Sequence, residues 1–134
     1  MIVTPIKAQA GIVGFESPAS EYTQSSLSLD ELLIDHPSAT YFAGVDGDSM
    51  TSIGIFQDDI LIVSRAIKPK HMSIVVANLN GVFVCKHLDL ERRALVSAND
   101  AFNPYFITEG DEFQVEGVVT RSIRMFVPLR KGLC

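Results

Sequence analysis

The sequence predicts a mainly β domain of small curved antiparallel sheets, with one short helix and a mobile N-terminal arm. From residue 39 onward, runs of β-branched and aromatic residues alternate with short turns rich in Gly, Asn, Asp and Pro, which is typical of strands. Before residue 39, one segment has the spacing of an amphipathic helix. Many short strands with a single helix indicate a partly open barrel or a set of curved sheets.

The N-terminal part of the chain divides into an arm and a helix. Residues 1–26 are small, polar or turn-forming and show no sustained period, so we expect a flexible arm followed by one domain over residues 27–134. Ser28 and Glu31 form a capping-box pattern, and Pro37 limits the helix that follows. The apolar face of this helix would consist of Leu29, Leu32 and Leu33.

The predicted strands follow one another along the rest of the chain. The runs "ATYFAGV" and "DILIVSRAI" supply the first two. Asn80 and Gly81 suit the two left-handed positions of a type I′ turn, so strands at about 73–79 and 82–89 should pair antiparallel. Further strands are expected near 94–98 and within "EFQVEGVVTRSIRMFV" at 112–127.

Composition limits the classes of function. A chain of 134 residues with 47% hydrophobic and 20% charged residues fits one globular domain. Its net charge of −5 argues against direct DNA binding, and no segment approaches the roughly eighteen apolar residues of a membrane span. Cys85 and Cys134 do not form a disulfide pattern, which favours the cytoplasm. His36, His71 and His87 are scattered, so unless they converge in space we expect no metal and no other cofactor.

A lysine interrupts an aliphatic row in the second strand of the predicted hairpin. Period-2 alternation places Val82, Val84, Lys86 and Leu88 on one face of that strand. Such a lysine either snorkels to water and guards a strand edge, or is desolvated by its aliphatic neighbours. Desolvation would lower the pKa of the lysine, so that more of it is the neutral amine, which can accept a proton.

A serine stands at a glycine-led corner in "GDSMTSIG", residues 47–54. Serine is common in turns because its geometry suits them, so Ser49 by itself indicates only a turn. A serine hydroxyl within hydrogen-bond reach of a neutral lysine is instead a nucleophile of the Ser-Lys type. Neither Ser49 nor Lys86 identifies a function alone.

Three segments together resemble a known family. "PSATYFAGVDGDSM", "DDILIVSRAI" and "KPKHMSIVVANLNGVFVCKHL" are similar in order and spacing to the self-cleaving peptidase domain of LexA, phage repressors and UmuD, and most similar to its UmuD-like members. The likeness runs from about Gly14 to Val127. It implies the LexA/UmuD-type peptidase fold, with Ser49 as nucleophile and Lys86 as base, 37 positions apart.

The resemblance also implies a cellular role. UmuD-like proteins cleave their own N-terminal arm in the SOS response when they meet a RecA filament on single-stranded DNA. The shortened homodimer then serves as accessory subunit of an error-prone Y-family polymerase, a UmuC-like subunit, in translesion synthesis. The alternative is a UmuD-like binding module that regulates such a polymerase with slow or no cleavage.

The arm offers two candidate scissile bonds. The bond between Ala10 and Gly11 has the small residue that the family usually places before the glycine. The bond between Val13 and Gly14 stands directly before "FESPA", which resembles the family's F-x-S-P-A segment, but Val13 is β-branched and stiff. We favour the first bond and keep the second as the alternative.

The remaining expectations concern neighbours of the two candidate residues. Asp48 and Met50 should position Ser49, with backbone N–H groups around it forming the oxyanion hole. Cys85 should point away from Lys86 and act as a small buried hydrophobe. Asp58 and Met72 replace glycines of the family pattern at two turns, so we expect altered loop shapes there.

Overall fold

The computed structural model describes residues 28–129, in which residues 28–35 and the segment from residue 36 onward form separate units. The first unit contains helix α2 (Leu29–Leu33), whose N-cap Ser28 accepts a hydrogen bond from the Glu31 N–H at 3.1 Å. This confirms the predicted helix and its cap. The predicted arm over residues 1–26 and both candidate scissile bonds lie outside the described residues.

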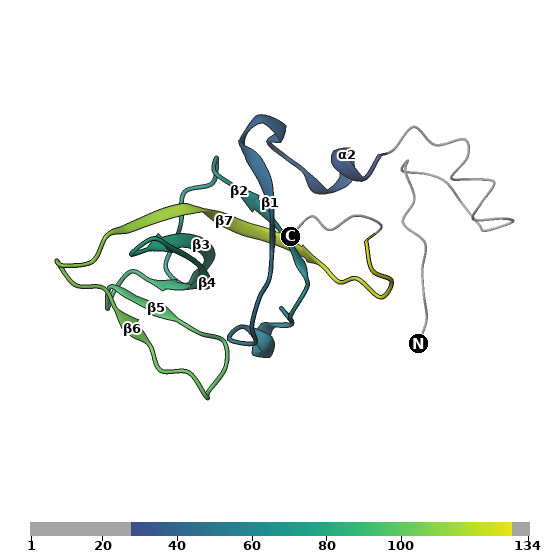
Figure 1. The fold of residues 1–134 in the computed structure, drawn as a ribbon. Coiled ribbons are helices and arrows are strands. Elements are labelled where there is room, and N and C mark those ends of the chain that lie inside the picture. The colour runs from purple at the N-terminus through teal and green to yellow at the C-terminus, as the bar shows by residue number, and fades with distance from the viewer. Residues whose placement is uncertain (1–27, 130–134) are drawn as a thin grey trace, which may run out of the picture. The chain divides into compact units, whose positions relative to one another are not determined.

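The second unit is one antiparallel sheet of seven strands in the order β1-β2-β7-β3-β4-β5-β6 (Figure 1). The mainly β prediction is confirmed, and the strands form one sheet where several had been expected. Two short 3-10 helices, η1 (Pro37–Ala39) and η2 (Thr51–Ile53), flank β1 and the turn after it. The strands are β1 (Thr40–Gly44), β2 (Ile60–Ser64), β3 (Ser73–Leu79), β4 (Val82–Asp89), β5 (Ala94–Val96), β6 (Tyr105–Phe106) and β7 (Phe113–Ile123).

The β3–β4 hairpin has the predicted turn and register. Asn80 and Gly81 have φ angles of 52° and 85°, as a type I′ turn requires, and Leu79 pairs with Val82. The Asn78 side chain accepts the Gly81 N–H at 2.9 Å and reinforces the turn. Because this register is fixed, the position of residue 86 along the sheet is fixed as well.

The long strand β7 curves the sheet. Its pairing slips by one residue against β2, between Ile62 and Val63, and again against β3, between Val76 and Ala77. Such bulges bend a strand and increase its twist. A Cβ on Gly117 would lie 2.6 Å from Val63 Cγ1, so β2 and β7 can approach this closely only with glycine there.

Curvature divides the buried side chains into two clusters. The first packs around the corner that carries Ser49, and the second packs between β3, β4, β5 and β7. The first cluster contains Met50, Ile55, Leu61, Val63, Val76 and Val119, and the second contains Val75, Ala77, Leu88, Leu95 and Val118.

Within residues 28–129, no helix has the length and hydropathy needed to cross a membrane.

The two turns where the family pattern has glycine keep a backbone that glycine would favour. Asp58 has a φ of 70° and Met72 a φ of 63°, both in the left-handed region. Most residues with a Cβ pay about 1 kcal/mol or more for this conformation, although Asp tolerates it better than Met. The surrounding bonds therefore set the backbone conformation at these turns. The Cβ atoms of Asp58 and Met72 make that conformation strained.

Replacing Met72 by glycine should stabilise the protein. Met72→Gly removes the Cβ from a left-handed position, and because the side chain is 38% exposed its loss gives up only part of the packing of a fully buried methionine. We expect the free energy of unfolding, measured in urea, to rise by about 0.5–1 kcal/mol. Asp58→Gly should gain less. Met72→Ala is the control, because it keeps the Cβ at the same φ; an equal gain in Met72→Ala would show that backbone strain is not the cause.

Candidate active site

Ser49 lies on the corner between β1 and β2, and backbone bonds close this corner at its base. The Val45 N–H donates to Asp59 O and the Asp58 N–H donates to Val45 O, each at 2.9 Å. The Gly47 N–H donates to the Gln57 side chain at 2.7 Å. The corner is therefore a closed loop, held by two backbone bonds and by the side chain of Gln57.

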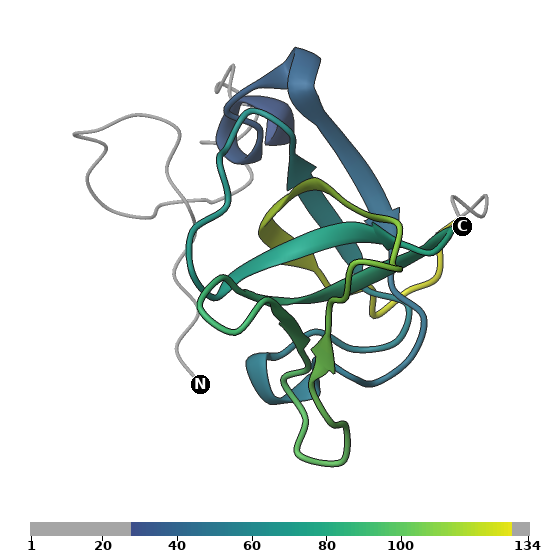
Figure 2. The same cartoon turned by 90° about the vertical axis from the view of Figure 1, so that its left-hand side faces the viewer.

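Met50 fixes the corner to the segment after β5. Its side chain is 3% exposed, and its Sδ accepts the Ala98 N–H at 3.3 Å. The Ala98 carbonyl accepts the Ser52 N–H at 2.8 Å, and the Asn99 amide donates to the Asp48 carbonyl at 2.9 Å. Figure 2 shows the loop between β5 and β6 beside the short helix η2. Asp48 and Met50 thus position the corner, Asp48 through its backbone and Met50 through its buried side chain.

An ion pair between buried Asp59 and partly exposed Arg124 holds the far side of the same loop. Asp59 is 2% exposed and accepts hydrogen bonds from Arg124 Nε and from the Phe56 N–H, at 3.2 and 2.9 Å. Burial raises the pKa of Asp59, but these hydrogen bonds outweigh it and hold the pKa below its ordinary value. Arg124 also donates to the Gly54 carbonyl at 2.7 Å and lies over the Phe56 ring.

Strand β4 brings the lysine to this corner. Lys86 Nζ lies 2.6 Å from Ser49 Oγ, although the two residues are 37 positions apart. Nζ also lies 2.9 Å from Ser97 Oγ and 5.5 Å from the centre of the Phe102 ring. Burial lowers the pKa of Lys86 from its usual 10.5. The structure therefore brings together the two residues that the sequence singled out, with the lysine partly desolvated.

The serine and the lysine open onto a cleft of about 400 Å³. One wall is the end of β1 with the corner, and the other is the first part of β4. Of the residues of β4, only 87–89 pair with β5, and within the described residues β1 pairs only with β2. Both walls thus present backbone edges without a strand partner among residues 28–129. The lining is mainly apolar and includes Gly44, Val45, Gly47, Met50, Val82, Phe83 and Val84.

Cys85 is a poor candidate for a nucleophile. Its side chain packs against the buried cluster around Met50. Burial raises the pKa of its thiol to about 11, and the neighbouring Lys86 offsets only part of this rise. A thiol that stays protonated near neutral pH is a poor nucleophile.

The sequence did not indicate Ser97, Asn99, Phe102 or Arg124 as parts of this region. Ser97 and Asn99 occur in "SANDAFNP", which reads as an ordinary polar loop. Their contacts join segments 11 to 51 positions apart in the chain. Only the alternation of Ser97 with Asn99 after a short strand could have drawn attention to them, and that signal is weak.

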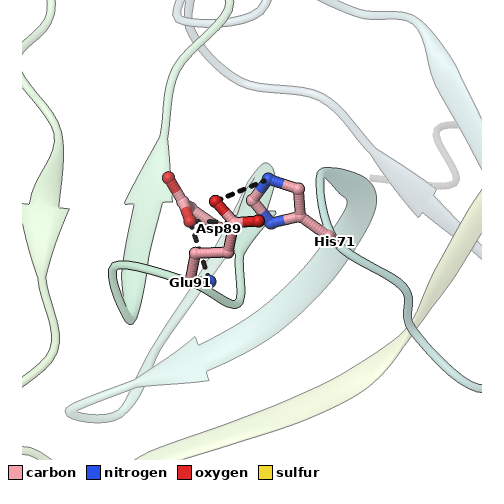
Figure 3. A group of neighbouring side chains, drawn as sticks. All are labelled: His71, Asp89 and Glu91. Carbon is pink, nitrogen blue, oxygen red and sulfur yellow. Dashed lines mark hydrogen bonds and ion pairs between the residues drawn. The ribbon is translucent and has the colours of Figure 1, made fainter.

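A second group of titratable side chains converges near the turn between β4 and β5 (Figure 3). His71 lies 3.6 Å from Asp89 and 3.9 Å from Glu91. Asp89 Oδ1 already accepts the N–H groups of Glu91 and Arg92, and Oδ2 accepts from Arg92 Nε at 2.7 Å. The Leu90 N–H donates to His71 Nδ1 at 3.2 Å. These donors occupy both Asp89 oxygens and His71 Nδ1, so we assign Asp89 and His71 to holding the turn.

Comparison with known proteins identifies the family. The Peptidase S24-like family model matches residues 3–120. The chain is 38% identical to Protein SamA of Salmonella typhimurium over 120 residues, covering 89% of this chain and 84% of SamA. It is 40% identical to Protein MucA of Escherichia coli over 121 residues, covering 89% and 83%. It is 39% identical to Protein ImpA of Shigella flexneri over 130 residues, covering 96% and 88%.

These matches span nearly the whole chain and most of each relative, and they cover both the Ser49 corner and strand β4. SamA, MucA and ImpA are UmuD-like proteins. The chain therefore belongs to the Peptidase S24-like family and is a relative of its UmuD-like members.

Proposed function

We propose that this protein is a self-cleaving serine peptidase of the SOS response, in which Ser49 attacks a bond of the protein's own N-terminal arm and Lys86 is the general base. The observation that carries the proposal is the 2.6 Å contact between Lys86 Nζ and Ser49 Oγ at the edge of a cleft. Family membership supports the same chemistry.

The first step requires an uncharged lysine. Neutral Lys86 accepts the Ser49 hydroxyl proton on its nitrogen lone pair while Ser49 Oγ forms a bond to the scissile carbonyl carbon. The resulting ammonium donates that proton to the leaving amine as the C–N bond breaks, which leaves an ester on Ser49. Water then attacks this ester, Lys86 takes the water proton and returns it to Ser49 Oγ, and the carboxylate product leaves.

The cleft provides the other requirements of peptide hydrolysis. The backbone N–H groups of Ser49 and Met50 are the donors we assign to the oxyanion hole, since the Gly47 N–H is already bonded to Gln57. The open backbone edges of β1 and of residues 82–86 suit an extended peptide that adds as a strand. An arm segment with small residues fits the apolar lining.

The same proposal covers the cellular role. We assign the protein to the cytoplasm, as a homodimer whose arm is cut on contact with a RecA filament on single-stranded DNA. The processed form then acts as accessory subunit of a UmuC-like Y-family polymerase in translesion synthesis. The net charge of −5 favours a connection to DNA through these protein partners. No metal or cofactor is needed for the steps above.

Removing either member of the pair should abolish self-cleavage. Ser49→Ala and Lys86→Ala should each lower the rate by at least about 10³-fold, because the two residues act as a unit. The measurement is the intact mass of the chain after incubation with RecA, nucleotide and single-stranded DNA. Ser52→Ala and Lys70→Ala are the matched controls, because both side chains are exposed and neither belongs to the pair. Cleavage by either pair variant at the wild-type rate would refute the assignment, and a wild type that never cleaves would favour the binding module.

The rate of cleavage without RecA should rise with pH and then level off. Only neutral Lys86 is active, so the rate should increase about tenfold per pH unit below the lysine pKa and become constant above it. Burial lowers the pKa of Lys86, so the plateau should begin below pH 10.5. Lys86→Arg should show no such rise, since a guanidinium stays protonated throughout. A rise with a midpoint near 11 would point to the Cys85 thiol instead.

The mass of the product should locate the cut between Ala10 and Gly11. The small Ala10 side chain leaves the attacked carbonyl accessible, whereas the β-branched Val13 crowds it. A product that begins at Gly11 confirms the first bond and one that begins at Gly14 confirms the alternative. A product beginning at Ile12, or anywhere after Gly14, contradicts both.

A further inference from the structure

Lys86 contacts a second hydroxyl besides that of Ser49. Ser97 directly follows β5, is half-buried, and places its Oγ 2.9 Å from Lys86 Nζ. Its neighbour Ala98 is bonded on both sides to the corner, through its N–H to Met50 Sδ and through its carbonyl to the Ser52 N–H. The backbone that carries Ser97 is thus fixed to the loop that carries Ser49.

A neutral lysine needs such a partner. Its amine has two N–H groups and one lone pair, and it can turn freely about the Cε–Nζ bond. The lone pair faces Ser49 only in part of these orientations. A hydroxyl oxygen that accepts one N–H fixes the rotation, and Ser97 Oγ lies at the distance that such a bond requires.

We propose that Ser97 is a positioning residue of the active site, which accepts an N–H from the neutral Lys86 amine and so directs its lone pair at the Ser49 hydroxyl. This inference rests on the proposed function, because it gives Ser97 a role only if Lys86 is the base. Ser97 does not touch the substrate and exchanges no proton.

Ser97 also favours the state that follows proton transfer. The ammonium form of Lys86 donates three N–H groups, and Ser97 Oγ accepts one of them in a charge-assisted bond. The face of Phe102, 5.5 Å away, attracts the same cation. Both contacts strengthen as positive charge develops on Nζ, so they stabilise the transition state more than the ground state.

Loss of Ser97 should therefore have two effects on the pH profile of self-cleavage. The plateau rate should fall, because the amine loses its orientation, and the midpoint should move to lower pH, because the ammonium loses an acceptor. The groups facing Lys86 from the corner and from the loop between β5 and β6 are Ser49, Ser97 and Phe102, which do not titrate in this range. The adjacent titratable residues on β4 are Cys85 and His87. The pKa of Cys85, about 11, lies higher, and His87 contacts the Met72 carbonyl oxygen through Nδ1 at 3.0 Å.

The experiment compares wild type with Ser97→Ala, Ser97→Thr and Ser38→Ala. Single-turnover rates of self-cleavage are measured from pH 6 to 11, and the Lys86 pKa is followed separately by NMR with lysine labelled at Cε. We expect Ser97→Ala to lower the plateau about 10- to 100-fold and to lower both the kinetic midpoint and the NMR pKa. Ser97→Thr, which keeps a hydroxyl, should recover most of the rate and the midpoint. Ser38→Ala, at an exposed position before β1, should match wild type.

Each outcome decides the inference separately from the proposed function. Wild-type rate and midpoint in Ser97→Ala, while Ser49→Ala and Lys86→Ala are inactive, would overturn the role of Ser97 and leave the pair intact. If Ser97→Ala lowers the rate but leaves the midpoint unchanged, or if Ser97→Thr does not recover the rate, then Ser97 only contributes packing. Either result would also overturn the positioning role of Ser97. If wild type does not cleave, the proposed function fails. Independently of cleavage, an NMR pKa of Lys86 that is the same in wild type and Ser97→Ala would show that Ser97 does not interact with the Lys86 amine, and would overturn the inference.

Discussion

The proposed active site depends on one short contact between an amine and a hydroxyl that belong to different parts of the sheet. Lys86 is placed by the register of the β3–β4 hairpin, whereas Ser49 is placed by a loop that begins at the end of β1. A shift of either element by one residue would move its side chain to the other face or several ångströms along the strand. The fold therefore has to hold a hairpin and a loop in one fixed relation.

Two sets of bonds maintain that relation. On one side, the segment after β5 is bonded to the corner through Ala98 and Asn99 and to the lysine through Ser97. On the other side, Arg124 at the end of β7 holds the loop through the buried carboxylate of Asp59. The bulges in β7 supply the curvature that the sheet needs in this region. Strain at Asp58 and Met72 is tolerated because the bonds around these turns outweigh it.

Local rules made much of this structure predictable from sequence. The capping pattern at Ser28, the Asn80-Gly81 turn and the β-branched runs each depend on neighbouring residues, and each gave the correct element. Lys86 could be singled out because it interrupts an aliphatic row, and Ser49 because, together with Lys86, it matches a family motif. The two-residue strand β6 and the contacts of Ser97, Asn99 and Arg124 could not be predicted, since they arise only when distant segments meet.

The shortness of β5 and β6 has a consequence for how the site can fail. These two strands have three and two residues, so few backbone bonds hold them to the rest of the sheet. Segments with few bonds open locally at a lower free energy than the whole domain. Each opening of this hairpin would withdraw Ser97, Phe102 and the donor to Met50 together, while β2, β3 and β7 stay folded. Heating or mild denaturant would then stop the proposed self-cleavage before the domain unfolds, and a partner that holds the hairpin closed would favour it without touching Ser49.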